Sequence, residues 1–281
     1  MTASAAAATS GVARSPARRG GGGGVGQTRL PLGAAYAVML VLLYLPIVLL
    51  AVFSLNNGTT LTFPLKGFTL TWYQAMVGDQ ALLGAARNSL VVATAAATAA
   101  TALGFAVSQA VLRFRFTGRR LLLGLAGAPL VVPFVVLGVA LFLLFTALGI
   151  PRSLLTIAAG HSVVALPYAT LILLARMVGL DPALEEAAMD LGATYPVTLR
   201  RVIIPLLGPS LLSAWLTCFI VSFDEVALAN FLAGGDPTFP VFLYGQLRFA
   251  QRLPVLIAMA VVLMIGTIIL TLIANRLRSR D

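Results

Sequence analysis

Two adjacent carboxylates, Asp224 and Glu225, lie inside a long apolar run at about 206–232. A helix rises about 1.5 Å per residue, so the two acids would lie roughly 27 Å from the start of a helix over this run. If that start is at the cytoplasmic face, they lie in the outer part of the membrane. Ionisable side chains inside a span are costly and usually face a bundle interior or a water-filled cavity. The pair therefore predicts a cation-attracting site on a translocation path, or else a structural salt bridge to Arg87, Arg248 or Arg252.

A second pair of acids, Glu185 and Glu186, lies in a polar stretch between two apolar runs. Asp181-Pro182 predicts a helix start there, with Asp as the N-cap and Pro in the first helical position. Acids in the early turns of a helix are favoured by its dipole. Leu184, Ala187, Ala188 and Leu191 recur at helical spacing and form one apolar stripe.

The polar stretch continues beyond this first short helix. Gly192 can end that helix in a left-handed conformation. Tyr195-Pro196 predicts a second short helix, which carries Arg200 and Arg201 and stops near Pro205. The result is a pair of helices lying across one membrane face, either as a docking surface for a soluble partner or as a connector that covers the bundle.

Catalytic and metal chemistry are not supported by the remaining residues. The only histidine, His161, has no Cys, Asp or Glu neighbour, and we expect it to be packed or interfacial rather than a ligand. The only cysteine, Cys218, cannot form an internal disulfide. The only lysine, Lys66, follows Leu65, whereas a phosphate-binding loop needs Gly-Lys-Ser/Thr. We therefore expect no enzyme activity, no metal and no bound cofactor, and any ATP would be bound by a partner.

Composition places the chain in the membrane. It is 59% hydrophobic and 10% charged over 281 residues, which indicates a polytopic α-helical membrane protein. The net charge of +10 comes from short basic clusters between apolar runs, so it does not indicate a nucleic-acid partner.

Six apolar runs each hold the roughly 20 residues that cross a hydrocarbon core as a helix. They fall at about 32–55, 84–112, 121–148, 155–178, 206–232 and 253–275, within a membrane domain of residues 30–281. Residues 1–29 are rich in Ala, Ser and Gly and are predicted to be a disordered tail. The small residues of 93–102 predict that the second span lies inside the bundle.

Basic residues are distributed unequally between the two faces. Fourteen fall on the side of the N-terminus, and five, Lys66, Arg87, Arg152, Arg248 and Arg252, fall on the other. Both termini and the loop 180–205 are therefore predicted to be cytoplasmic.

The order of residues in this loop resembles a known motif. Glu186-Ala187-Ala188, Gly192 and Val202-x-Ile204-Pro205 are similar to the E-A-A-x-x-x-G-x9-I-x-L-P motif of ABC-importer permeases, with Val for Ile and Ile for Leu. The spacing is intact. The resemblance extends to Asn88-Ser89-Leu90, to the basic turn 113–120 and to Ser222-Phe223-Asp224-Glu225. The last of these resembles the spermidine/putrescine subgroup and its second permease subunit.

This resemblance implies a type I importer permease with six spans in the bacterial inner membrane, carrying a polyamine. It also implies a periplasmic binding protein, a second permease subunit and an ATPase dimer that receives the loop. The coupling residues would be Glu185, Glu186, Ala187, Ala188, Gly192 and Pro205, and the substrate path would include Asp224 and Glu225. The cargo could instead be another organic amine, an opine or an iron complex, and a transporter driven alone by an ion gradient is a further alternative.

Overall fold

The computed structural model describes residues 32–278, and the regular secondary structure in that range is helical, apart from one isolated bridge between Asn56 and Phe68. The prediction of an all-α membrane protein is confirmed. The predicted tail, residues 1–29, lies outside the described residues.

Four of the described helices are each long and apolar enough to cross a membrane. They correspond to the runs expected at 32–55, 84–112, 155–178 and 253–275, and the first of them ends two residues earlier than expected. In chain order they are α1 (Leu32–Phe53), α3 (Gln80–Arg113), α6 (Leu154–Val178) and α13 (Leu253–Arg278).

The run at 121–148 is not one straight helix. It divides into α4 (Arg119–Gly127), a 3₁₀ turn (Ala128–Leu130) and α5 (Phe134–Ala147), and the two parts meet at 110°. Pro133 stands at the break, where its ring and its missing N–H interrupt the helical hydrogen bonds.

The run at 206–232 is also divided. Its helix α10 (Gly208–Phe223) ends just before the two acids, and a short helix, α11 (Ala229–Leu232), follows. The segment Tyr195–Leu206 enters α10 through a 71° bend. If each bent pair counts as one span, the described residues have up to six candidate spans, the number that the sequence predicts, although this pair covers 195–223 rather than 206–232.

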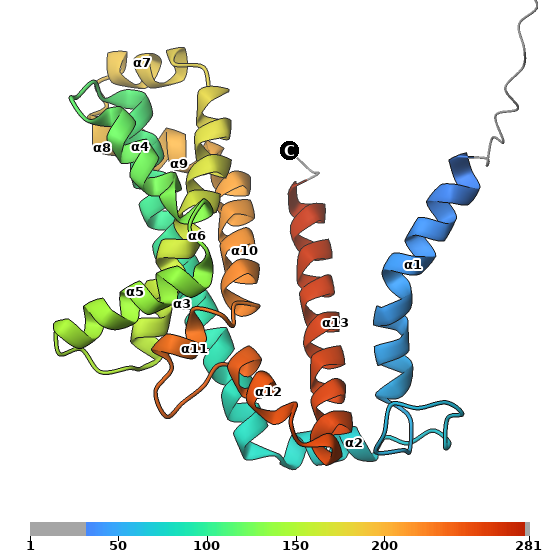
Figure 1. The fold of residues 1–281 in the computed structure, drawn as a ribbon. Helices are drawn as coiled ribbons and strands as arrows, with labels where there is room; N and C mark the ends of the chain where they lie inside the picture. The colour runs from blue at the N-terminus through green and yellow to red at the C-terminus, as the bar shows by residue number, and fades with distance from the viewer. Residues whose placement is uncertain (1–31, 279–281) are drawn as a thin grey trace, which may run out of the picture. The chain divides into compact units, whose positions relative to one another are not determined.

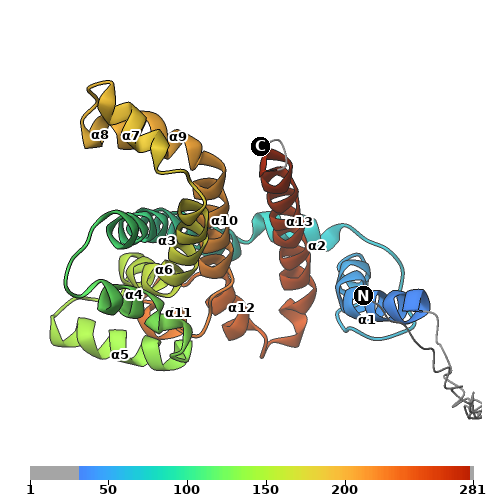
Figure 2. The same cartoon turned by 90° about the horizontal axis from the view of Figure 1, so that it is seen from above.

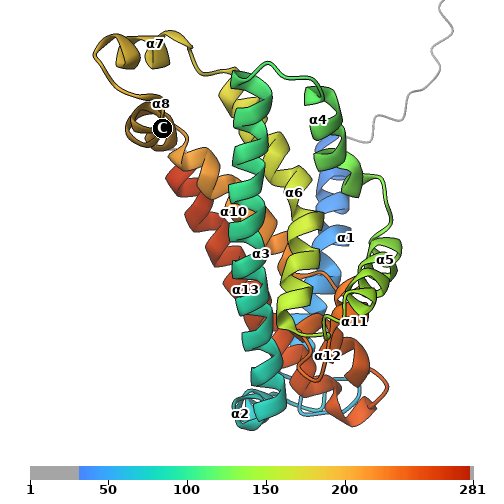
Figure 3. The same cartoon turned by 90° about the vertical axis from the view of Figure 1, so that its left-hand side faces the viewer.

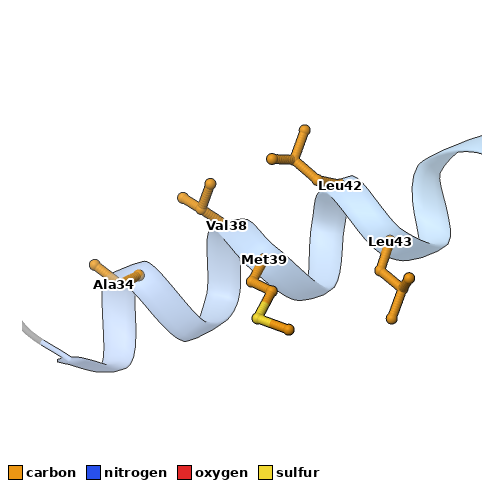
Figure 4. Close-up of a pocket in the computed structure, with 6 residues that line it drawn as sticks. Ala34, Val38, Met39, Leu42 and Leu43 are labelled. Carbon is orange, nitrogen blue, oxygen red and sulfur yellow. The ribbon is translucent and has the colours of Figure 1, made fainter.

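Helix α1 is apolar around its whole circumference and contains Pro46. Ala34, Val38 and Leu42 follow one another along one side, with Met39 and Leu43 beside them (Figure 4). Such a helix suits a lipid environment, because no side of it requires water.

Small residues bring three helices of the remaining chain close together. Ala93, Ala97 and Ala100 of α3 are fully buried against Ala165 and Ala169 of α6 and against Ala214 and Cys218 of α10. One side of the small-residue run of the second span thus lies inside the bundle, as predicted, while its other side is exposed in this chain. Gly104 is required for the contact, because a Cβ there would lie 2.7 Å from the Cβ of Ala169.

The three helices lie side by side in two views of the molecule (Figures 2 and 3). The loop 180–205, which we call the acidic loop, lies at one end of them (Figure 1). It contains α7 (Ala183–Asp190), α8 (Tyr195–Thr198), a π-helical turn (Leu199–Ile203) and the start of α9 (Ile204–Leu206).

The other end of α3 lies beside two short helices. One is α2 (Thr71–Gly78), which leads into α3, and the other is α12 (Phe239–Gln246), which a 3₁₀ turn (Ala250–Arg252) joins to α13. Ser89 Oγ accepts the Phe239 N–H at 2.9 Å, and Asn88 Nδ2 donates to the Pro237 carbonyl at 3.1 Å. The start of the second span therefore fixes the start of α12.

Candidate functional site

Helix α7 begins and ends largely as its sequence predicts. The Asp181 carboxylate accepts the Ala183 N–H at 2.9 Å, so it satisfies one of the free donors at the helix start. Gly192 has φ +85°, the left-handed conformation expected of a glycine after a helix. Its N–H donates to the Met189 carbonyl at 2.8 Å and turns the chain toward α8.

The two acids of α7 point in different directions. Glu185 is buried, and its Oε1 lies 2.5 Å from Arg113 Nη2 at the end of α3. Glu186, the next residue in the helix, is exposed. Since successive residues of a helix are about 100° apart, only one of the two can face the bundle.

The predicted apolar stripe of α7 faces outward. Leu191 is 90% exposed and Leu184 is 44% exposed, while the charged Glu185 takes the inward position. Ala187 is exposed, Ala188 is half-buried, and Pro205 in α9 is exposed. The acidic loop thus presents apolar side chains and the exposed carboxylates of Glu186 and Asp190 away from the helices, a composition typical of docking surfaces.

The contact between the acidic loop and α3 includes an aromatic pair. The rings of Phe114 and Tyr195 meet edge to face, with centroids 5.9 Å apart. Burial and the nearby Glu185 carboxylate raise the pKa of the Tyr195 phenol, so the phenol stays neutral at physiological pH.

The two acids beyond α10 are also separated by the fold. Glu225 is buried, and its carboxylate accepts the N–H groups of Leu228 at 2.7 Å and of Ala229 at 2.9 Å. These are donors at the start of α11, so Glu225 caps that helix and fixes the turn after α10. This explains why the apolar run at 206–232 does not continue as one helix.

His161 completes the surroundings of Glu225. Its Nε2 lies 3.2 Å from Glu225 Oε2, and its Nδ1 is hydrogen-bonded to Ser222 Oγ at 2.8 Å. His161 is 1% exposed, which agrees with the expectation that it is packed, but the acid it contacts is 64 residues away in the sequence. The sequence also allowed a salt bridge from these acids to Arg87, Arg248 or Arg252. Glu225 does not form one, because its partner is His161. Arg252 pairs with Asp79 instead.

Asp224 is exposed and lines two cavities beside α13, which we call the Asp224 cleft. The larger has a volume of about 340 Å³ and is bounded by α10, α12 and α13. The smaller has a volume of about 280 Å³ and includes Thr267 and Thr271. No Lys or Arg is among the residues that line either cavity, so a cation entering the cleft would meet a carboxylate, threonine hydroxyls and apolar walls.

Sequence reasoning missed the partners of the two buried acids. Arg113 is one of four arginines in a basic turn, and nothing in its neighbourhood distinguishes it from Arg115. Among the described residues there is no group of three or more His, Cys, Asp or Glu side chains that could hold a metal ion. The arrangement therefore has an exposed apolar face with carboxylates at one end of the bundle and a cleft lined by one carboxylate beside the last span.

Residues 100–280 match the family described as "Binding-protein-dependent transport system inner membrane component". The chain belongs to this family. It is therefore a multi-pass inner-membrane component of a transport system that depends on a binding protein, and not an enzyme. The prediction of an ABC-importer permease is confirmed.

Characterised relatives cover most of the chain. It is 31% identical over 254 residues to the spermidine/putrescine transport system permease protein PotC of Escherichia coli K12, covering 90% of this chain and 95% of the relative. It is 36% identical over 214 residues to the putrescine transport system permease protein PotI of the same strain, covering 73% and 76%. PotC of Haemophilus influenzae is 34% identical over 197 residues, covering 70% and 76%.

Solved structures support the fold. A chain from a bacterial ABC transporter that imports the acidic polysaccharide alginate aligns with a TM-score of 0.68 at 18% identity, covering 89% of this chain and 97% of that one. A second alginate transporter structure, in complex with a periplasmic protein bound to an alginate pentasaccharide, aligns with a TM-score of 0.66 at 16% identity, covering 89% and 92%.

Proposed function

We propose that this permease forms one half of the membrane path of a polyamine importer, with putrescine or spermidine as its cargo. The names of three relatives at 31–36% identity support the cargo. The Asp224 cleft supports it independently, because a protonated amine that leaves water needs a countercharge. Asp224 supplies that charge, whereas the carboxylate of Glu225 is already occupied.

The acidic loop receives the ATPase. The observation that carries this assignment is the orientation of α7, whose inward position is taken by the Glu185–Arg113 ion pair and whose apolar stripe is exposed. A connector that merely covered the bundle would bury its apolar side instead. Glu186, Ala187, Ala188, Gly192 and Pro205 would then contact or shape the groove of the ATPase.

The remaining partners are those that the family implies. A periplasmic binding protein delivers the cargo, a second permease subunit completes the path, and two ATPase copies bind and hydrolyse the ATP. Both termini and the acidic loop lie in the cytoplasm, as the excess of arginine on that side favours.

Two other assignments are tested against this one. The same permease could carry another organic amine, an opine or an iron complex, in which case the relatives' cargo would not transfer to it. A transporter that works alone on an ion gradient would need neither the ATPase nor an exposed docking face.

The proposal is tested by purifying a tagged form of the chain with its partners and reconstituting it in liposomes. We expect an ATP-binding-cassette ATPase and a second permease subunit to co-purify. Uptake of labelled putrescine should require both the binding protein and ATP on the ATPase side. Uptake that follows an imposed ion gradient in the absence of ATP would overturn the proposal.

A further inference from the structure

The acidic loop is joined by the chain to only two helices of the bundle, α6 before it and α10 after it. The third helix at the centre, α3, has no covalent link to the loop. Its last residue, Arg113, nevertheless reaches Glu185 of α7, with 2.5 Å between Nη2 and Oε1. Phe105 and Leu112 of α3 also pack in one apolar cluster with Ile203 of the loop. The ion pair is the charged contact that joins the loop to α3, the central helix to which the chain does not connect it directly.

This ion pair is sheltered from water. The side chain of Arg113 is 18% exposed and that of Glu185 is 12% exposed. In such surroundings the attraction between opposite charges is stronger than at a fully exposed site, and an unpaired charge is costly. The rings of Phe114 and Tyr195 meet beside the pair and hold α8 to the same end of α3.

The central helices are themselves tightly joined. Ser108 Oγ of α3 donates to the Thr170 carbonyl of α6 at 3.3 Å, and Gly104 brings the two backbones together one turn away. The shared alanine cluster extends this contact to α10. With the ion pair in place, the acidic loop and all three central helices are linked into one body.

We propose that Arg113 and Glu185 are positioning residues that lock the acidic loop to α3, so that displacement of the loop by the ATPase moves α3 together with α6 and α10. The proposal rests on the proposed function, because it requires an ATPase at the acidic loop. It assigns the transmission of movement to Glu185, the inward acid, and leaves contact with the ATPase to Glu186 and the exposed stripe.

The test uses the complete transporter, with its ATPase, second permease subunit and binding protein, in lipid nanodiscs. The readout is the stimulation of ATP hydrolysis by the loaded binding protein, at equal amounts of assembled complex. We expect Arg113→Glu and Glu185→Arg each to retain the ATPase on purification and to lose stimulation by about fivefold or more. The exchange of both charges in one chain should restore most of it.

Arg115→Glu is the matched control, since Arg115 is exposed two residues beyond Arg113, and stimulation should be unchanged. If a single charge reversal prevents assembly, the double variant Arg113→Gln with Glu185→Gln removes both charges and keeps an uncharged polar side chain at each position. Stimulation should again fall.

The possible failures can be distinguished. Two results would overturn the role of Arg113 and Glu185 and leave the proposed function standing. One is unchanged stimulation in variants that lack the ion pair, and the other is a charge exchange that assembles but does not restore stimulation. A wild-type chain that purifies without any ATPase would overturn the proposed function and the lock together.

Discussion

Two pairs of neighbouring acids, one before α10 and one after it, are divided in the same way. Glu185 is buried against Arg113 while Glu186 is exposed on the acidic loop. Glu225 is buried against His161 and the start of α11, while Asp224 is exposed in the cleft. In each pair one carboxylate holds the structure and the other is free to meet a partner or a cargo.

The difference between the two pairs lies in what the buried acid stabilises. Glu225 accepts two backbone N–H groups and lies against a histidine, all with almost no exposure, so it fixes the turn after α10. Glu185 pairs with a flexible arginine at the rim of the bundle and joins two separate elements. We therefore expect loss of Glu225 to affect folding, and loss of Glu185 to affect communication between subunits.

The largest expected effect is that of Glu225→Ala. Removing this carboxylate leaves two backbone donors and His161 without their partner, at a cost of about 3–5 kcal/mol, as for other broken buried pairs. The measurement is thermal unfolding of the purified chain in detergent, with Asp224→Ala as the matched control that should unfold near the wild-type temperature. If Glu225→Ala unfolded at the wild-type temperature but lost uptake, Glu225 would act in transport and would not be the structural acid of the pair.

Asp224→Asn should come next. It preserves the shape of the side chain and removes its charge, so uptake of putrescine should fall by about tenfold, equivalent to about 1.4 kcal/mol. The amount of assembled transporter in the membrane should stay the same, which is checked by quantifying the tagged chain. Loss of assembly in Asp224→Asn would instead make this acid structural.

Glu186→Arg should have a smaller effect, because a single exposed charge at an interface contributes modestly. We expect several-fold weaker retention of the ATPase during purification. Asp236→Arg, an equal change of charge on an exposed residue of the loop after α11, should leave retention unchanged. If Glu186→Arg preserved both retention and uptake, the coupling role of the outward acid would be wrong.

The smallest expected effect is that of Ser222→Ala. It removes one hydrogen bond to His161, with a net cost of about 1 kcal/mol. The unfolding temperature should fall slightly while uptake by each folded molecule remains normal. A large loss of uptake without loss of stability would place His161 and Ser222 on the cargo path.

The helices could be predicted because a chain inside lipid has few alternatives to helical structure. An apolar run of about 20 residues must satisfy its backbone internally, and the runs of α3 and α6 therefore predict their helices closely. The breaks at Pro133 and after Phe223 were not predicted. The first had a local signal in the proline, whereas the second depends on Glu225 and His161, which are distant in the sequence.

The sequence predicted which residues form the site, but not which way their side chains face. The motif at Glu186-Ala187-Ala188 identified the acidic loop and its family, and Asp224 with Glu225 identified the acids near the cleft. Which acid of each pair turns inward depends on tertiary partners. Arg113 is 72 residues before Glu185, and no local spacing connects them.

The central claim is that this permease carries polyamines. It is tested most directly by uptake of labelled putrescine and spermidine in the source cell, with the gene deleted and then restored, in a background without another polyamine importer. We predict that uptake falls to background on deletion and returns with the restored gene. Unchanged uptake on deletion would contradict the polyamine assignment, and the cargo would then be sought as the ligand of the partner binding protein.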